Sequence, residues 1–221
     1  MSAGGLPVLE AHGLSLTYAD GPRRVEAVRD ASLVVARGES VGIVGPSGSG
    51  KSSLLFLLGG LRRPDAGEVR LLGRPLAPEP EANAALRRRH VGFLFQEPFL
   101  VPYLSVRENA LAHVEGAQAA DRLEALAAAV GMRDLLDERP WRLSGGQRQR
   151  AGLLRALAGD PDLVLADEPT AFLDQPAGEA VMDLLEAQRG RAALVVVTHD
   201  RGMLARASRV LALADGRLRP A

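Results

Sequence analysis

The chain contains no cysteine and few aromatic residues, which account for 4% of its 221 positions. Without cysteine it has no disulfide framework, no thiolate nucleophile and no cysteine-ligated metal, which is typical of a protein from a reducing compartment. No run of apolar residues approaches the roughly 18 that a membrane span requires. Residues 1–5 lack the charged and apolar segments of a secretory signal. We therefore predict a soluble, cytoplasmic chain.

An excess of one charge is also missing, because 27 basic residues balance 27 acidic ones. We therefore predict no nucleic-acid partner and no general attraction to an anionic membrane, and we interpret the basic run 87–89 as a solvated face. A hydrophobic content of 47% excludes a disordered chain. At this length the chain can bury the core of one large α/β domain.

Lysine occurs once, whereas the other 26 basic residues are arginine. The segment that holds it is Gly45-Pro46-Ser47-Gly48-Ser49-Gly50-Lys51-Ser52, which fits the P-loop pattern G-x-x-x-x-G-K-[ST]. In such a loop, backbone N–H groups surround phosphates, glycines allow the close approach, and the compact ammonium reaches the β and γ phosphates. A strand pattern at 40–44 precedes the loop and a helical pattern at 52–61 follows it, as the motif requires. The segment predicts a nucleotide site.

Several apolar runs predict strands. Segments 8–18 and 25–36 alternate loosely around a turn at Asp20-Gly21-Pro22, as half-buried antiparallel strands do. The shorter runs predict a mostly parallel sheet. They lie at 40–44, 91–95, 163–166, 192–198 and 210–214.

Helical patterns dominate between Gln96 and Gly159, where residues 105–108 form a capping box and residues 117–130 are rich in alanine and leucine. We predict one α/β domain over 1–221. Its core and an N-terminal antiparallel β subdomain occupy 1–95 and 160–221, and an inserted helical subdomain occupies 96–159.

Two carboxylates, Asp167 and Glu168, follow the run 163–166. The carboxyl ends of parallel strands meet at one edge of a sheet, so both acids should lie beside the P-loop. In a P-loop enzyme Asp167 would hold Mg²⁺ with Ser52, and Glu168 would orient or deprotonate the attacking water. The alternative is an acidic turn that caps a helix predicted at 174–188.

A second helix start is rich in glycine. In Leu143-Ser144-Gly145-Gly146-Gln147 the serine and glutamine form a capping box, and the two glycines leave bare N–H groups for an anion. The P-loop already covers one side of the chain's own nucleotide. The second site therefore predicts a partner's nucleotide, in a head-to-tail dimer with ATP at the interface.

With these three motifs in this order, nearly the whole chain resembles the ATP-binding subunit of an ABC transporter, a P-loop NTPase with a RecA-like core. The resemblance identifies residues 45–52 as Walker A, 143–147 as the signature, and 163–167 as Walker B with Glu168 as the catalytic carboxylate. It implies an ATPase that uses Mg-ATP, and it adds Ser53 to the ATP-binding residues.

Further site residues are implied by the resemblance alone. Tyr18 resembles the aromatic residue that stacks on adenine, Gln96 the glutamine that senses Mg²⁺ and the attacking water, and His199 the histidine that contacts the γ-phosphate. Taken alone, Tyr18 would more often be a strand-face residue, Gln96 an exposed residue and His199 a structural one. Asp174 matches the family's D-loop aspartate, but Ala171-Phe172 departs from the usual Ser-Ala or Gly-Asn before it.

Shorter strings are similar to the lipoprotein-release and macrolide-exporter group, and they include Leu58-Gly59-Gly60-Leu61 and Gly92-Phe93-Leu94-Phe95-Gln96. This likeness implies a separate integral membrane permease, which would hold the ATPase on the inner face of the cell membrane. An ATPase that moves a non-transport membrane complex, such as one of cell division, stays open. One acting on DNA or ribosomes is disfavoured, because the chain has a single cassette with neutral charge and no long coiled coil between the P-loop and the signature. A GTPase is disfavoured because the guanine-reading Asn-Lys-x-Asp needs a second lysine.

Overall fold

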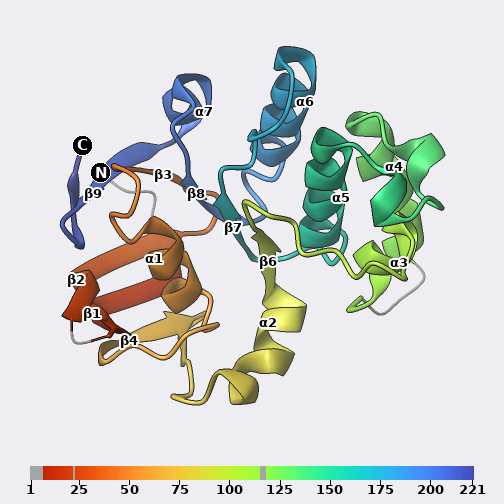
Figure 1. Cartoon of the computed structure of the whole chain (residues 1–221). Helices are drawn as coiled ribbons and strands as arrows, with labels where there is room; N and C mark the ends of the chain where they lie inside the picture. Colours follow the sequence, from red (N-terminus) through yellow and green to blue (C-terminus); the bar gives the residue numbers. More distant parts are fainter. Residues whose placement is uncertain (1–6, 22, 115–117) are drawn as a thin grey trace.

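Two sheets form the body of the protein in a computed structural model, which describes residues 7–21, 23–114 and 118–221 (Figure 1). The first sheet has four strands in the order β2-β1-β4-β5 and its pairs are antiparallel. Its strands are β1 (Pro7–Asp20), β2 (Arg23–Ala36), β4 (Ala66–Leu71) and β5 (Arg74–Pro75). The predicted hairpin is confirmed, with Tyr18 opposite Val25, although Pro22 of its turn lies outside the described residues.

The second sheet has six strands in the order β10-β9-β3-β8-β7-β6. These strands are β3 (Ser40–Val44), β6 (Val91–Leu94), β7 (Leu163–Asp167), β8 (Ala193–Val197), β9 (Arg209–Ala214) and β10 (Arg217–Pro220). All its pairs are parallel except β9 with β10, which confirms the predicted mostly parallel sheet.

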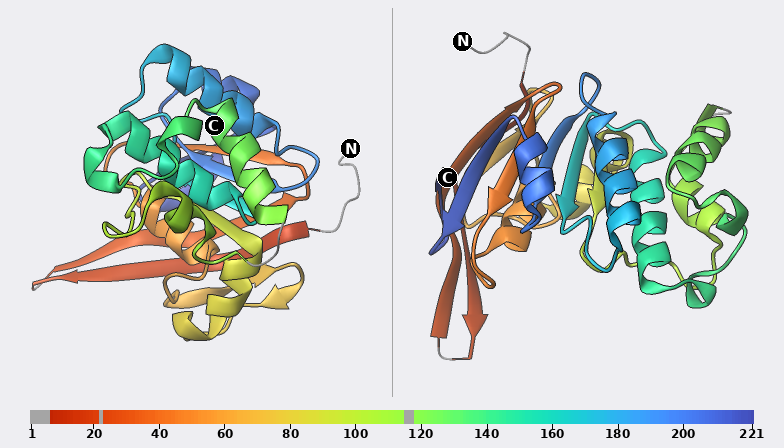
Figure 2. Two further views of the ribbon diagram at one scale, coloured as in Figure 1. Left: turned by 90° about the vertical axis from the view of Figure 1, so that its right-hand side faces the viewer. Right: turned by 90° about the horizontal axis from the view of Figure 1, so that it is seen from above.

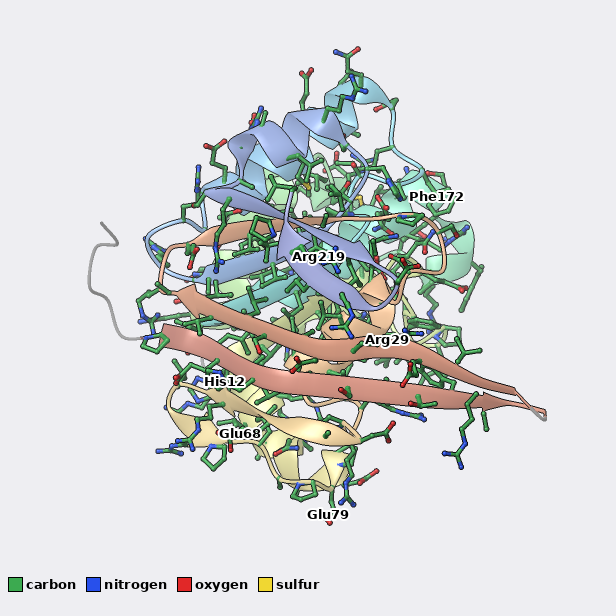
Figure 3. All side chains as sticks on the ribbon, turned by 90° about the vertical axis from the view of Figure 1, so that its left-hand side faces the viewer. His12, Arg29, Glu68, Glu79, Phe172 and Arg219 are labelled. Carbon is green, nitrogen blue, oxygen red and sulfur yellow. The ribbon has the colours of Figure 1, made fainter. Side chains whose placement is uncertain are left out.

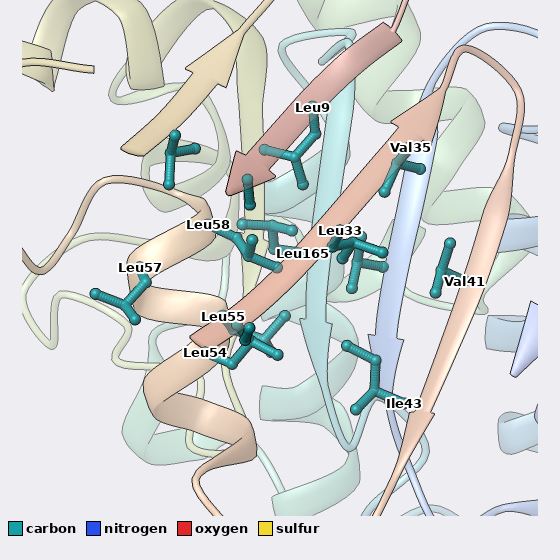
Figure 4. Packing of buried hydrophobic residues seen from close by; sticks show 14 of the residues in the cluster. Leu9, Leu33, Val35, Val41, Ile43, Leu54, Leu55, Leu57, Leu58 and Leu165 are labelled. Carbon is teal, nitrogen blue, oxygen red and sulfur yellow. The ribbon is translucent and has the colours of Figure 1, made fainter. Parts of the chain in front are cut away.

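Residues of the parallel strands alternate between two hydrophobic cores. Leu163 and Leu165 of β7 belong to one cluster, whereas Val164 and Ala166 belong to the other. Successive side chains of a strand point to opposite faces, so a sheet covered on both sides buries all of them. The first cluster fills the space between the antiparallel sheet, helix α1 (Lys51–Leu58) and the parallel strands (Figure 4).

Helices form the second cluster on the opposite face of the parallel sheet. They are α3 (Val106–Leu111), α4 (Gln118–Ala129), α5 (Gly145–Leu157) and α6 (Gln175–Glu186). Helices α3, α4 and α5 lie at the end of the molecule farthest from the β1–β2 hairpin (Figure 2). Both predicted capping boxes are present, and Ala117 of the predicted α4 segment lies outside the described residues. The division of the chain at 96 and 159 stays a prediction.

Some elements are short or were not anticipated. Helix α1 ends at Leu58 rather than 61, because Gly60 adopts a left-handed φ of 64°. Helices α2 (Ala84–His90) and α7 (Arg201–Arg206) and three 3₁₀ turns complete the fold. These turns are η1 (Pro80–Asn83), η2 (Arg133–Leu135) and η3 (Pro140–Arg142).

The interpretation of residues 87–89 as a solvated face is wrong for Arg87. Its guanidinium donates to the carbonyls of Gly60 and Pro80, and burial lowers its pKa. Arg88 and Arg89 are exposed, as expected. The helical register of α2 turns one of three adjacent arginines inward, which composition alone does not reveal.

Polar side chains lie on the outer face of the antiparallel sheet between β1 and β4. His12 on β1 lies opposite Glu68 on β4, and both side chains are exposed (Figure 3). Their neighbours Ala11 and Val69 are buried on the inner face. This alternation fixes which side of the sheet packs on α1, and it therefore places the start of α1 beside the β1–β2 hairpin.

Candidate active site

The glycine loop connects β3 to α1 and is shaped by contacts with the rest of the chain. Gly50 has a φ of 97° and a side chain there would overlap the carbonyl of Ala27 on β2. A side chain at Gly45 would overlap the carbonyl of Leu213 on β9. These two glycines are therefore required by close backbone approach within the protein itself. Gly48 has open space around it and a φ of 76°, so only its backbone conformation favours glycine.

The ammonium of Lys51 lies back over this loop. Its Nζ donates to the carbonyl oxygens of Gly45 and Pro46, each at 2.8 Å. Both acceptors are neutral, so the positive charge is free to attract an anion bound above the loop. At the start of α1 the helix dipole and its free N–H groups favour an anion in the same place.

Ser52, one residue further along α1, meets the end of β7. Its Oγ donates to Oδ2 of Asp167 at 2.5 Å. Asp167 is 7% exposed, so little water competes for its carboxylate. Two oxygen groups that converge from separate elements are suitable ligands for a hard cation such as Mg²⁺. Within the part of the chain that the structure describes, no group of three or more His, Cys, Asp or Glu could hold a metal ion. Phosphate and water oxygens would have to supply the other ligands.

Glu168 follows directly and has a left-handed φ of 46°. This conformation turns its carboxylate toward the end of β8. There Oε2 accepts hydrogen bonds from Oγ1 of Thr198, at 3.1 Å, and from the backbone N–H of His199, at 3.3 Å. Nε2 of His199 lies 3.5 Å from Oε1. The acidic-turn alternative is wrong, because Asp174 itself caps α6 by accepting from the N–H of Ala177.

One cleft of about 630 Å³ collects most of the predicted residues. Its lining includes Tyr18, Ser47, Gly48, Gly50, Lys51, Ser52, Ser53, Gln96, Asp167, Glu168 and His199. Gly45, Pro46, Ser49 and Asp174 do not line it. Gly45 and Pro46 instead hold Lys51 through their carbonyls. The P-loop, both carboxylates and the histidine are therefore gathered at one edge of the parallel sheet.

Tyr18 lies at the hairpin side of this cleft. Its hydroxyl lies 3.2 Å from Oγ of Ser53, and the guanidinium of Arg62 lies 5.1 Å from its ring centroid. Sequence reasoning missed Arg62. Pairing an arginine with an aromatic ring 44 residues earlier depends on how β1 packs on α1, so no local pattern could have found it.

The signature residues, by contrast, lie outside this cleft. Ser144 Oγ accepts from the N–H of Gln147 at 3.2 Å, and Gln147 Oε1 accepts from the N–H of Ser144 at 2.8 Å. Gly145 lines a different cleft of about 410 Å³, together with Gln96 and Phe172. Phe172 is 73% exposed, has a φ of 65° and also lines the larger cleft. It was noticed in the sequence only as a departure from the usual D-loop.

A strand, a glycine loop and a helix at the carboxyl edge of a parallel sheet, with an acid at the end of a neighbouring strand, define a P-loop NTPase. A family model described as "ABC transporter" matches residues 28–171. The chain belongs to the ABC transporter family and is an ABC ATPase.

Curated relatives agree with this assignment. The lipoprotein-releasing system ATP-binding protein LolD of Chromohalobacter salexigens is 43% identical over 221 residues, covering 96% of this chain and 92% of that protein. The uncharacterized ABC transporter ATP-binding protein YbbA of Escherichia coli K12 is 41% identical over 219 residues, covering 96% of each. The macrolide export ATP-binding/permease protein MacB 1 of Aeromonas hydrophila is 43% identical over 217 residues, but the chain spans only 34% of its length.

Solved structures share the fold. A dimeric post-hydrolysis state of the ATP-binding cassette MJ0796 bound to ADP and Pi superimposes with a TM-score of 0.87 at 32% identity, covering 95% of this chain and 96% of that one. A second dimeric structure of MJ0796, described as a bacterial ABC transporter cassette, gives 0.88 at 33% identity. In the described residues, no helix is both long and apolar enough to cross a membrane.

Proposed function

We propose that two copies of this chain bind two Mg-ATP head to tail, hydrolyse them, and drive conformational change in a separate membrane permease of the export or lipoprotein-release type. The proposal rests on the separation of the P-loop from the signature, the two elements predicted to bind phosphate. Lys51 and Glu168 line one cleft, whereas the signature lies outside it. The dimeric cassettes among the structural relatives support the same arrangement.

Within one copy, the P-loop N–H groups and Lys51 would bind the phosphates. Ser52 and Asp167 would hold Mg²⁺, which would supply positive charge to neutralise the negative charge that develops on the phosphates. Their oxygens already converge at 2.5 Å, and the buried position of Asp167 strengthens its hold on a cation.

Glu168 would orient and deprotonate the attacking water. Thr198 and the N–H of His199 hold one carboxylate oxygen, which leaves Oε1 toward the cleft. The imidazole of His199 is 61% exposed and can donate to a γ-phosphate. Gln96 lines the same cleft, and in this proposal it would contact Mg²⁺ or the water. The catalytic assignments of Glu168, His199, Gln96 and Lys51 are part of this proposal.

The partner copy would complete the site with its signature. Gly145 and Gly146 lie in the first turn of α5, where N–H groups have no acceptor within the helix, and the Ser144 cap takes the N–H of Gln147 instead. A side chain at Gly146 would come within 3.0 Å of the carbonyl of Phe172, so glycine keeps this surface close to the D-loop. Together with Leu143, Ser144 and Gln147, these residues would bind the γ-phosphate of the other copy.

Dimerisation tests the proposal. Glu168→Gln keeps the shape of the site but removes the general base, so Mg-ATP should convert this variant into a stable dimer while turnover falls by roughly two orders of magnitude or more. Light scattering after size exclusion measures the mass. Glu179→Gln, an exposed change on α6, is the matched control and should behave as wild type. A Glu168→Gln protein that stays monomeric in saturating Mg-ATP contradicts the head-to-tail site.

A groove next to Gln96 supports a permease partner. It has a volume of about 380 Å³, and its apolar lining includes Phe93, Phe95 and Phe99. The Phe95 ring lies 5.2 Å from that of Phe93 and 5.5 Å from that of Phe99. Phe99 is 64% exposed and continues the stacked rings of the groove, so its ring is available to pack against a partner.

Co-purification tests this partner. Glu168→Gln protein in Mg-ATP should retain a membrane protein from detergent extract, and its identity distinguishes a transporter from a non-transport complex. Adding Phe99→Ser should lower the recovery severalfold without changing nucleotide-dependent dimerisation. Val34→Ser, an exposed apolar change on β2, is the control. Equal recovery with both variants would place the permease elsewhere.

A further inference from the structure

Helix α5 begins at the signature, and one of its faces contacts both the segment after Gln96 and the backbone of Glu168. A side chain at Gly152 would overlap Pro98, and Arg155 donates to the carbonyls of Pro98 and Phe99. The segment that follows Gln96 is therefore packed against α5 and hydrogen-bonded to it. Residue 149 lies on the same face, three positions before 152. It is a glutamine, and its side chain reaches the backbone of Glu168, directly after β7.

Gln149 is 1% exposed, and its Nε2 donates to the backbone carbonyl of Glu168 at 3.4 Å. Its side-chain oxygen is buried and accepts no hydrogen bond from the described residues. A buried amide with only one long hydrogen bond costs free energy relative to an apolar residue of the same shape. Stability therefore does not explain why an amide stands here.

The carbonyl that Gln149 contacts belongs to a residue with unusual backbone geometry. Glu168 has a φ of 46°, and its carbonyl also accepts from the N–H of Ala171 at 3.0 Å. The orientation of this peptide unit fixes where the carboxylate of Glu168 points. Gln149 of α5 thus contacts the Glu168 peptide directly. It lies one turn from Gly145 and Gly146, which would face the partner copy.

We propose that Gln149 is a positioning residue, which couples engagement of the signature by the partner's nucleotide to the orientation of Glu168 in the same chain. This inference rests on the proposed function and adds its regulation. Because α5 packs tightly through Gly152 on Pro98, a shift at its first turn moves Gln149 as part of a rigid element. The water-activating carboxylate then takes its working position only when both copies are docked.

The test is Gln149→Met, which keeps length and volume but removes the amide. We expect kcat to fall roughly tenfold, because a small misplacement of a catalytic group is costly. The KM for ATP should stay within twofold and the unfolding midpoint should equal or exceed that of wild type. Gln188→Met is the matched control, because Gln188 is also buried and donates to the carbonyl of Leu184 on α6. It should lose stability and keep its kcat.

A double-mutant cycle supplies the second measurement. If Gln149 acts through Glu168, then Gln149→Met should change single-turnover hydrolysis by less than twofold in the Glu168→Gln background. An additive tenfold loss there overturns the inference. So does wild-type kcat in Gln149→Met, or a loss of kcat accompanied by a matching fall in the unfolding midpoint. The proposed function fails separately, if the wild-type chain neither binds nor hydrolyses Mg-ATP.

Discussion

The hydroxyl of Thr198 donates to the carboxylate of Glu168 at 3.1 Å, across the ends of two neighbouring parallel strands. The hydroxyl oxygen of Thr198 also accepts from the backbone N–H of Asp200, at 3.0 Å. Thr198 is fully buried, so both bonds are shielded from water. A strand-end threonine therefore joins the general-base candidate of β7 to the turn that carries His199.

Replacing Thr198 with valine should remove both of these hydrogen bonds. Valine matches the shape of threonine but removes the hydroxyl, so the Glu168 carboxylate loses one of its two anchors and the Asp200 N–H loses its acceptor. We expect kcat to fall about tenfold and the free energy of unfolding to fall by about 1–2 kcal/mol. Steady-state ATPase assays and urea titrations measure both. Thr17→Val, on β1, serves as the control, and unchanged kcat in Thr198→Val would remove this anchor from the mechanism.

The loop glycines provide a matched pair. Gly50→Ala places a methyl group against the carbonyl of Ala27 and also opposes a φ of 97°, whereas Gly48→Ala opposes only a φ of 76° in open space. We expect about 1 kcal/mol of destabilisation for Gly48→Ala and clearly more for Gly50→Ala, because backbone must move. Chemical denaturation measures both. Equal losses would mean that the contact with Ala27 does not constrain the loop.

Local patterns predicted a large part of this site, since the P-loop, the acids after β7 and both capping boxes are each written in consecutive residues. Contacts between distant segments could not be predicted in the same way. The close approach of Leu213 to Gly45 and of Ala27 to Gly50, which leaves no room for a side chain, follows from how β9 and β2 pack on the loop. The short strand β4 was missed because only Val69 and Leu71 of its six residues are buried, which leaves too little alternation.

The single lysine permits a chemical test of the P-loop. An amine-reactive label has only one side-chain target, Lys51, and the N-terminal amine of the purified chain is an internal control. Bound nucleotide would surround the Lys51 ammonium with phosphate oxygens, so we expect Mg-ATP to reduce labelling of Lys51 severalfold and to leave the N-terminal amine unchanged. Peptide mass spectrometry measures both. Equal labelling with and without Mg-ATP would contradict the assignment of Lys51 to the phosphates.

At the opposite edge of the parallel sheet, Asp162 links β6 and β7 to the rest of the core. Its carboxylate lies 2.7 Å from Nδ1 of His90 and 2.6 Å from Nη2 of Arg37. Burial by itself would raise the pKa of Asp162, but the hydrogen bonds from His90 and Arg37 outweigh it and hold the pKa below its ordinary value of 3.8.

This depressed pKa predicts how stability depends on pH. A carboxylate whose pKa is lower in the folded protein contributes stability that is fully present above its unfolded pKa, near 4, and is lost as the pH falls through the folded value. We expect Asp162→Asn to be less stable than wild type at pH 7, and the difference in unfolding free energy to shrink as the pH falls from about 5 to 3. Urea titrations across this range measure it, with the exposed Asp134→Asn as the control. A difference that stays constant down to pH 3 would show that the carboxylate charge of Asp162 contributes nothing to the fold.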